Sequence, residues 1–278
     1  MEIKKVRTFG ELVNDTFSFV SQNFVGLFKP ILLYASPFAL LSAFFYSKIE
    51  LSVLTKQEYG DPTVNMLAYI ATLLIANILL VGIVYGYVYF YVKQGKDNFT
   101  MEDVWKYTTY NLEKIFRTLM LIIFFMIIGI LFFLIPSIFL KSTVLIVIPI
   151  LFLAITFLFI FAIMLYENVD YHLATLRCLM MIKGRWWNTF FKILVFNLLV
   201  IIFILIIKIP EFVYIFMFNA ELHKSIASLP LQYSIAATLG QYLVFFLQVF
   251  SQIIIILLYF SINEAYFKKD TTTTEPIV

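Results

Sequence analysis

The residues best placed to do chemistry in this sequence form a polar stripe near its carboxyl end. The stripe contains three glutamines, a tyrosine and an asparagine, spaced 7, 4, 7 and 4 residues apart: Gln241, Gln248, Gln252, Tyr259 and Asn263. Because a helix turns once in about 3.6 residues, this spacing puts all five on one side. A carboxamide or phenol in hydrocarbon needs a polar partner, so we expect the stripe to point into a helix bundle.

Two interpretations of the stripe stay open. Carboxamides commonly join neighbouring membrane helices through hydrogen bonds, and this packing role is the simpler of the two. The alternative is that the stripe lines a cavity for a polar headgroup or a small solute. Asn77 and Asn197, which lie in two other apolar runs, are then candidates to complete the lining.

Candidate catalytic residues are few and poorly placed. Glu167 and Asp170 lie three residues apart, but a solvated position at the start of a helix is the expected role for both. Cys178, the single cysteine, excludes an intramolecular disulfide and has no histidine placed to activate its thiol. His172 and His223 are expected on opposite sides of the membrane, so we do not expect them to share a metal ion.

Known catalytic motifs are also missing from the sequence. It contains no glycine-rich phosphate loop, no nucleophile elbow and no zinc motif with paired histidines. A metal-dependent phosphodiesterase needs clustered histidines and carboxylates around one phosphate, and two separated histidines do not supply them. We therefore predict a protein that is not an enzyme, with no catalytic residue, no metal site and no cofactor.

The composition indicates that membrane helices position these residues. Of the 278 residues, 62% are hydrophobic and 13% are charged, and the mean hydropathy is +0.95. Soluble domains are far less apolar. The net charge of +3 is too small to indicate a nucleic-acid partner.

Six apolar runs reach or approach the length of about 20 residues that a helix needs to cross a bilayer. They are 27–46, 64–91, 119–140, 144–166, 193–209 and 234–260. We predict an all-α integral membrane protein in which six transmembrane helices pair into three hairpins. Gly82 and Gly86 form a small-xxx-small pair in the second run, where helix packing inside the monomer is expected.

The distribution of basic residues sets the expected orientation. Fifteen of the 20 lysines and arginines fall on the side that holds both termini and the connections 93–117 and 167–192. By the positive-inside rule this side is the cytoplasm, so we predict a multi-pass protein of a bacterial cytoplasmic (inner) membrane with both termini inside. Four tyrosines near the inner end of the second run are expected in the aromatic belt: Tyr85, Tyr87, Tyr89 and Tyr91.

The connection 167–192 is predicted to begin with a helix on the cytoplasmic surface. Asn168 is expected to cap this helix, and Gly184 to end it in a left-handed turn. Its apolar face is Val169, Leu173, Leu176 and Met180. Cations and indoles here and at two other membrane boundaries are expected at headgroup level: Lys29, Arg117, Lys183, Arg185, Trp186, Trp187 and Lys192.

The same plan recurs three times along the chain. Thr8 with Glu11, and Thr100 with Asp103, each form a capping-box pattern before a stretch that leads into a span. We interpret the chain as three units, each a cytoplasmic amphipathic interfacial helix followed by a hairpin. The units are 8–92, 100–166 and 168–267 within a single domain, 1–267, and 268–278 is expected to be a disordered cytoplasmic tail. Chance convergence stays an alternative, because aromatic residues and cations are common at membrane boundaries.

Two segments carry a resemblance to a known family. The segment IKGRWWNTF, residues 182–190, resembles part of the multi-helix membrane domain that accompanies some bacterial glycerophosphodiester phosphodiesterases and also occurs alone. The opening VRTFGELVNDTFSFVSQNF, residues 6–24, is similar to the starts of stand-alone members, many from the Bacteroidota. The resemblance implies a six-helix membrane protein of largely uncharacterised role. It does not imply phosphodiesterase activity, because in such proteins a separate soluble barrel carries the chemistry.

We therefore expect a non-catalytic integral membrane protein that acts as a scaffold or lipid-interacting component. Its expected partners are membrane lipids, with anionic headgroups at the cytoplasmic face; no nucleic acid is expected and protein partners are unknown. The alternative is a facilitator or transporter of a lipid or small amphiphile through a polar-lined bundle cavity. Ion coupling is not expected, because no charged residue falls near the middle of a predicted span.

Overall fold

The computed structural model describes residues 1–57, 59–139, 144–219 and 229–272. Regular structure within these ranges is entirely helical. It consists of α1 (Phe9–Gln22), α2 (Phe24–Pro30), the π-helical turn η1 (Ile31–Ala35), α3 (Ser36–Thr55), α4 (Pro62–Gln94), α5 (Met101–Phe139), α6 (Val144–Thr156), α7 (Ile160–Tyr166), α8 (Tyr171–Ile182), α9 (Trp186–Ile207), α10 (Ile209–Asn219) and α11 (Leu229–Thr272).

Six helical segments of the described chain are long and apolar enough to cross a membrane, which confirms the predicted number. They are Phe24–Thr55, Pro62–Gln94, Met101–Leu134, Pro149–Tyr166, Trp186–Ile207 and Pro230–Tyr266. The first combines α2, η1 and α3. The protein is thus an all-α, multi-pass membrane protein, as the apolar runs predict.

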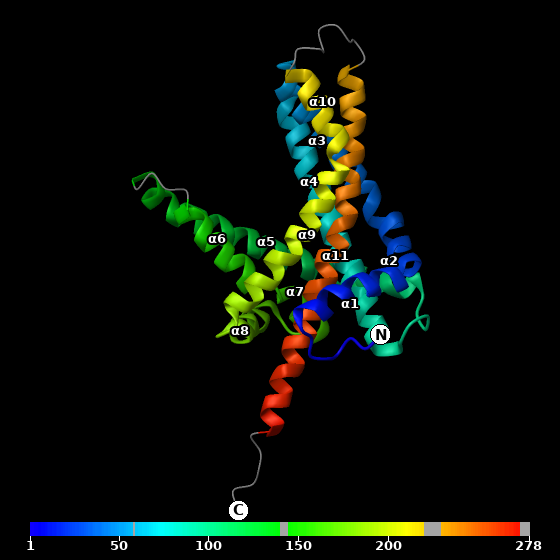
Figure 1. Ribbon diagram of the computed structural model, residues 1–278, viewed down its shortest axis with the longest axis vertical. Coiled ribbons are helices and arrows are strands. Elements are labelled where there is room, and N and C mark those ends of the chain that lie inside the picture. The colour runs from blue at the N-terminus through cyan, green and yellow to red at the C-terminus, as the bar shows by residue number, and fades with distance from the viewer. Residues whose placement is uncertain (58, 140–143, 220–228, 273–278) are drawn as a thin grey trace, which may run out of the picture.

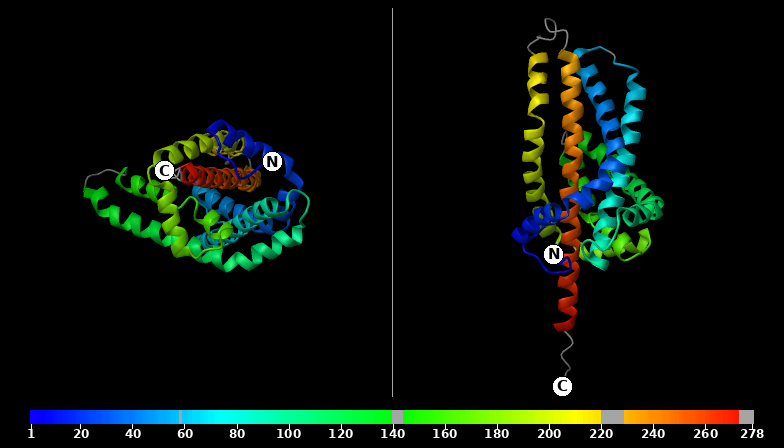
Figure 2. Two further views of the ribbon diagram at one scale, coloured as in Figure 1. Left: turned by 90° about the horizontal axis from the view of Figure 1, so that it is seen from below. Right: turned by 90° about the vertical axis from the view of Figure 1, so that its right-hand side faces the viewer.

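The helices form a tall bundle with a side arm. Figure 1 shows α3, α4, α10 and α11 running along the long axis, while α5 and α6 project to one side as a hairpin. Figure 2 shows that α11 lies centrally among the long helices and extends past them at the end where residue 1 lies. We call this end, which carries α1 and α8, the terminal end, and the opposite end, which carries α10, the distal end.

The predicted capping boxes are present at the starts of α1 and α5. The backbone N–H of Thr8 donates to the Glu11 carboxylate at 2.7 Å, and the Glu11 N–H donates back to Thr8 Oγ1 at 3.4 Å. Thr100 and Asp103 make the same reciprocal pair at 2.8 and 3.3 Å. Each box satisfies N–H groups that a helix start leaves unpaired, so the local sequence fixes both starts.

The start of α8 differs from the prediction. Asn168 does not cap the helix, because its backbone is left-handed with φ of 51°, whereas a capping residue is extended. The cap position belongs to Asp170, which has φ of −73° and ψ of 160°. Gly184 takes the expected left-handed conformation after α8, with φ of 74°.

Two helices run further than the predicted boundaries. The surface segment of the second unit and the third span form one continuous helix, α5, because the sequence between Asp103 and Arg117 contains no glycine or proline to break it. At the carboxyl end, α11 continues to Thr272, so residues 268–272 are helical rather than part of the expected tail. Residues 273–278 lie outside the described chain.

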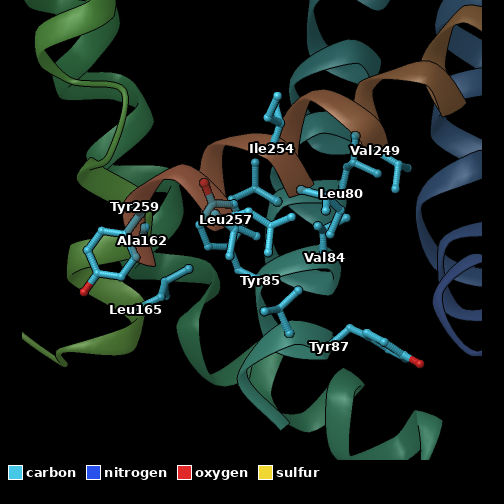
Figure 3. Close-up of a cluster of buried hydrophobic side chains, with 14 of the residues drawn as sticks. Leu80, Val84, Tyr85, Tyr87, Ala162, Leu165, Val249, Ile254, Leu257 and Tyr259 are labelled. Atoms are coloured by element: carbon cyan, nitrogen blue, oxygen red, sulfur yellow. The ribbon is translucent and has the colours of Figure 1, made fainter. Parts of the chain in front are cut away.

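The core of the bundle lies where α4, α7 and α11 meet. Figure 3 shows Tyr85 of α4, Ala162 of α7 and Leu257 of α11 converging there. Tyr85, Tyr87 and Tyr91 are buried, so the prediction of an aromatic belt is wrong for them. The physical reason is that α5, α7 and α11 pack against α4, and Phe19 of α1 lies against the rings of Tyr87 and Tyr91.

The glycine pair in α4 packs against α5, as predicted for a contact within the monomer. A Cβ atom on Gly82 would lie 2.5 Å from Thr108 Cγ2, and one on Gly86 would lie 2.9 Å from Tyr107 Cδ1. Side chains at either position would therefore force the two helices apart.

Candidate functional site

Two residues of the predicted stripe border a cavity at the terminal end. Tyr259 and Asn263 of α11 contribute to a cavity of about 390 Å³ that also involves α4, the end of α7 and the amino terminus. Its lining is Lys4, Tyr89, Val92, Lys93, Tyr166, Glu167, Tyr259, Phe260, Asn263 and Glu264. We call it the terminal cavity. Its two lysines and two glutamates offer both signs of charge to a ligand.

The other predicted lining residues lie elsewhere. Gln241, Gln248 and Gln252 are half-buried on α11, and none of them lines the terminal cavity. The side-chain amide of Asn77 donates to the Leu73 carbonyl at 2.8 Å, within its own helix. Asn197 is exposed, because α9 buries only the face that carries Phe196 and Val200, so its assignment to the stripe's lining is wrong.

Glu167 holds together the wall of the terminal cavity, a role that the sequence did not reveal. Tyr259 Oη donates to Glu167 Oε1 at 2.8 Å, and Arg177 of α8 forms an ion pair with the other oxygen. The Glu167 side chain is only 16% exposed. It is therefore a half-buried link between α7, α8 and α11 rather than the solvated cap that we expected.

A second hollow, the α5–α8 groove, has a volume of about 630 Å³. It lies between the middle of α5 and the segment 164–172, and its lining includes Glu113, Lys114, Arg117, Asp170 and His172. Lys114 Nζ donates to the Met164 carbonyl at 3.2 Å and to Asn168 Oδ1 at 3.4 Å. Arg117 is exposed and forms an ion pair with Glu113.

The start of α8 adds backbone donors to this groove. No side chain caps the first turn of α8, so N–H groups beside Tyr171 and His172 are free of side-chain partners. Such amides favour a negatively charged oxygen, and the helix dipole has the same sign of effect. The groove thus brings two basic side chains, one histidine and a helix start to one place.

Helix α8 has two apolar faces. Its buried face, Ala174, Cys178, Met181 and Ile182, packs on the protein. Three of the four residues of the face predicted from the sequence are exposed instead, and with Leu179 they form a row in which each residue is between 44% and 59% accessible: Leu173, Leu176, Leu179 and Met180. The fourth, Val169, lies before the start of α8 and packs against the core. Burial raises the pKa of the Cys178 thiol to about 12, so the thiol is protonated at neutral pH.

The residues expected at headgroup level separate into exposed and packed side chains. Lys29, Arg117, Lys183 and Trp187 are exposed, and Lys192 is half-buried. Arg185 lies over the Tyr266 ring, 4.5 Å from its centroid. Trp186 stacks on Phe190 and Phe152, with ring centroids 5.3 and 5.9 Å away, and so joins the start of α9 to α6.

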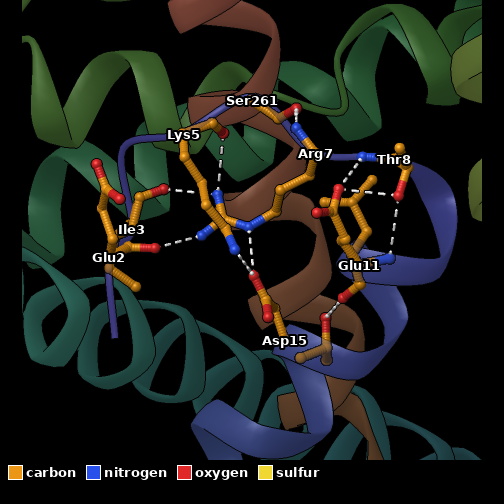
Figure 4. Close-up of polar contacts among 10 residues, drawn as sticks. Glu2, Ile3, Lys5, Arg7, Thr8, Glu11, Asp15 and Ser261 are labelled. Carbon is orange, nitrogen blue, oxygen red and sulfur yellow. Dashed lines mark hydrogen bonds and ion pairs between the residues drawn. The ribbon is translucent and has the colours of Figure 1, made fainter.

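Arg7 fastens the amino terminus across α11 (Figure 4). Its guanidinium donates to the Glu2 and Ile3 carbonyls at 2.5 and 2.6 Å and to Asp15 at 2.8 Å. Its backbone N–H donates to Ser261 Oγ at 2.8 Å. Burial alone would raise the pKa of Asp15, but the hydrogen bonds from Arg7 and Lys5 outweigh it and lower that pKa.

Charged residues also gather at the distal end, which the sequence did not reveal. Lys208 Nζ lies 2.9 Å from both carboxylate oxygens of Glu211, and Glu50 of α3 lies within electrostatic range of that pair. The spacing of Lys208 and Glu211 in the sequence could have predicted this ion pair, because residues at i and i+3 lie on one face of a helix.

Chemically, these sites offer charged groups and hydrogen-bonding groups to a ligand. Within the described ranges, no three His, Cys, Asp or Glu side chains gather closely enough to hold a metal ion. The terminal cavity and the α5–α8 groove both present basic and acidic groups next to apolar surface. Comparison with family models, curated proteins and solved structures finds no match to this chain.

Proposed function

We propose that this protein is a non-catalytic membrane protein that binds membrane lipid at its terminal end. The observation that carries the proposal is the exposed row Leu173, Leu176, Leu179 and Met180 on α8. In water such a row would be unfavourable, whereas at the boundary between headgroups and acyl chains it is buried. Lys183 and Trp187, both exposed just after the helix, suit the same boundary.

The α5–α8 groove supplies a place for the headgroup. Lys114, Arg117 and the free amides at the start of α8 suit a phosphate, since each donates hydrogen bonds to anionic oxygens. Asp170 and Glu113 suit an ammonium group on the same headgroup. A phosphate-containing lipid headgroup therefore fits the chemistry of the groove, with its acyl chains beside the apolar row.

The orientation and membrane are part of this proposal. The excess of lysine and arginine at the terminal end supports a cytoplasmic location for that end. A bacterial cytoplasmic membrane, with phosphate-bearing lipids in its inner leaflet, then presents the headgroups to the groove. The resemblance to the membrane domain that accompanies glycerophosphodiester phosphodiesterases stays a prediction.

Native mass spectrometry after gentle detergent extraction tests the proposal. The double variant Arg117→Gln, His172→Gln removes two exposed groups from the groove, and Lys96→Gln, Lys106→Gln removes two exposed cations that do not line it. We expect the wild type and the control to retain a phospholipid enriched over bulk membrane, and the groove variant to lose it. Bulk lipid alone in the wild type, or equal retention in both variants, would contradict the proposal and leave the scaffold role.

A second candidate function is a facilitator for a small amphiphile. The terminal cavity favours this function, because Tyr259 and Asn263, the last two residues of the polar stripe, line its wall. The variant Gln248→Leu, Gln252→Leu separates the two roles of the stripe. If these side chains only join helices, the variant unfolds at lower temperature; if they line a route, transport in vesicles falls while the unfolding temperature is kept.

A further inference from the structure

We propose that the distal end of the bundle contains a buried proton-binding site, formed by Glu50 of α3 and Glu211 of α10 around Lys208. The site lies between α3, α10 and α11, away from the termini (Figure 1). It goes beyond lipid binding, because it concerns a different end of the molecule and a different ligand.

The ion pair at its centre is almost completely removed from solvent. Glu211 is 3% exposed, and the Lys208 side chain is 13% exposed. Gly240 lets α11 approach closely, since a Cβ atom there would lie 3.4 Å from Glu211 Oε2. Lys208 Nζ also lies 5.2 Å from the centroid of the Tyr46 ring on α3. Three helices therefore enclose this one pair.

Glu50 adds a second carboxylate, on a half-buried residue, and no cation of the described residues forms an ion pair with it. Its Oε2 atom is buried and accepts no hydrogen bond from the described residues. The phenols of Tyr46 and Tyr233 lie against the same carboxyl group. Phenols at neutral pH are uncharged, so they can donate hydrogen bonds to the carboxyl group but do not neutralise its negative charge.

The charges in this part of the structure do not cancel. The titratable groups that surround the site in the described chain are Tyr46, Lys48 and Glu50 on α3, Tyr59 before α4, Tyr69 on α4, Lys208 after α9, Glu211 and Tyr214 on α10, and Tyr233 on α11. Lys48 Nζ is directed over the Phe44 ring at 4.6 Å. Among the residues that the structure describes here, one lysine therefore faces two carboxylates.

An unbalanced carboxylate in an apolar bundle is strongly unfavourable, and a proton removes the imbalance. Burial raises the pKa of Glu211, Lys208 opposes this rise, and the charge of Glu50 adds to it. Because the two carboxyls interact, the proton belongs to the pair rather than to one residue. The geometry thus supports a site that binds one proton and carries no net charge when occupied.

The site is coupled to helix packing. Beside it, Ser47 of α3 lies 3.0 Å from the hydroxyls of both Ser234 and Thr238 on α11. These hydroxyls join the same two helices that enclose the carboxyls. Loss of the proton would place repulsion across this contact, so occupancy of the site changes the stability of the α3–α11 packing.

Thermal unfolding of the full chain in detergent, followed by tryptophan fluorescence between pH 6 and 9, tests the site. A carboxyl in the unfolded chain loses its proton near about pH 4.3. A proton held only by the folded protein therefore stabilises at pH 6 and stops stabilising as pH rises. We expect the wild-type unfolding temperature to fall between pH 6 and pH 9. This fall should exceed the fall measured for Glu50→Gln by at least about 3 °C.

Charge arithmetic predicts an order among the variants. Glu50→Gln keeps the shape and balances Lys208 against Glu211, so its unfolding temperature is expected to be least sensitive to pH. Lys208→Met leaves two carboxylates and no cation, so it is expected to be most sensitive. Glu102→Gln, which changes an exposed carboxylate on α5 that lines neither the terminal cavity nor the α5–α8 groove, is expected to match the wild type. The same dependence in the wild type and in Glu50→Gln would overturn the proposal.

Two further measurements separate the proton from other sources of charge. Dicyclohexylcarbodiimide modifies protonated carboxyls in apolar surroundings, and peptide mass spectrometry should find Glu50 or Glu211 modified at pH 6 and at least tenfold less at pH 9. If sodium at constant pH and ionic strength raises the wild-type unfolding temperature but not that of Glu50→Gln, the ligand is a metal ion and the proposal is wrong. It is also wrong if His223→Gln, Lys224→Gln abolishes the wild-type pH dependence.

Discussion

The hydroxyl of Tyr259 on α11 donates a 2.8 Å hydrogen bond to Glu167, a residue 92 positions earlier in the chain. Glu167 is paired at the same time with Arg177 of α8. One carboxylate therefore connects the last helix of the bundle with the end of α7 and with the helix that we place at the membrane boundary. It also forms part of the wall of the terminal cavity.

Removing the Tyr259 hydroxyl should loosen this junction. In Tyr259→Phe, Glu167 keeps Arg177 but loses a hydrogen bond to a charged acceptor, so we expect a loss of about 1–3 kcal/mol in the free energy of unfolding. Denaturant-induced unfolding in detergent measures it. Tyr242→Phe is the matched control, because Tyr242 is half-buried on the same helix and makes only ring contacts within the described chain. Equal stability of the two variants would contradict the prediction.

Alanine at the α4–α5 contact should be destabilising. Gly82→Ala and Gly86→Ala each force a methyl group into atoms of α5, and we expect each to cost about 1–3 kcal/mol. Gly10→Ala in α1 has open space around the new methyl group, so alanine should stabilise that helix by up to about 1 kcal/mol. Thermal unfolding of the three variants checks the contrast in sign. A stabilising Gly82→Ala would show that α4 and α5 pack less closely than described.

Cys178 should be unreactive in the folded protein. Its thiol is buried, and burial raises its pKa to about 12, so both access and thiolate population are low. We expect maleimide to label it at least about 100-fold more slowly than Leu179→Cys in a Cys178→Ser background. Leu179 is 47% exposed on the next position of the same helix. Labelling at similar rates would mean that α8 detaches readily from the bundle.

The Arg7–Asp15 contact should make the free energy of unfolding decrease at acidic pH. Hydrogen bonds from Arg7 and Lys5 lower the pKa of Asp15 against the opposing effect of burial. The ionised carboxylate thus stabilises the fold above its unfolded pKa, about 3.9, and this contribution disappears as pH falls through the lower folded value. Asp15→Asn should cost about 1–3 kcal/mol at pH 7 and progressively less at lower pH.

Asp97→Asn is the control for that measurement, because Asp97 is exposed in a turn with φ of 64° that asparagine also tolerates. Its unfolding profile should follow the wild type across the acid range. A loss in Asp15→Asn that stays constant down to pH 3 would show that shape, rather than charge, explains the contact.

Features set by neighbouring residues could be predicted from the sequence. The six spans follow from runs of apolar residues, and the capping boxes at Thr8 and Thr100 follow from residues three positions apart. The close contact at Gly82 and Gly86 is also predictable, because the two glycines lie four positions apart in the sequence. Each of these signals lies within one short continuous stretch of the sequence.

The rotation of a helix about its axis was not predictable in the same way. Lipid is as apolar as a helix interior, so hydrophobicity does not tell which side of a span is buried. Asn197, which the sequence makes a candidate for the lining beside the stripe, is exposed for this reason. The meeting of Glu167 with Tyr259, and of Glu50 with Glu211, depends on contacts between distant parts of the chain.

Helix α11 contains 44 residues, which at the usual rise gives it a length of about 66 Å. Within it, Gly240 lies beside the Glu211 carboxylate, and Asn263, 23 residues and about 35 Å further along, lies in the wall of the terminal cavity. Because an α-helix resists bending, a change in its tilt moves residues along its whole length. The proposed proton site and the terminal cavity are therefore parts of one unbroken helix, and any tilt of that helix moves residues at both places.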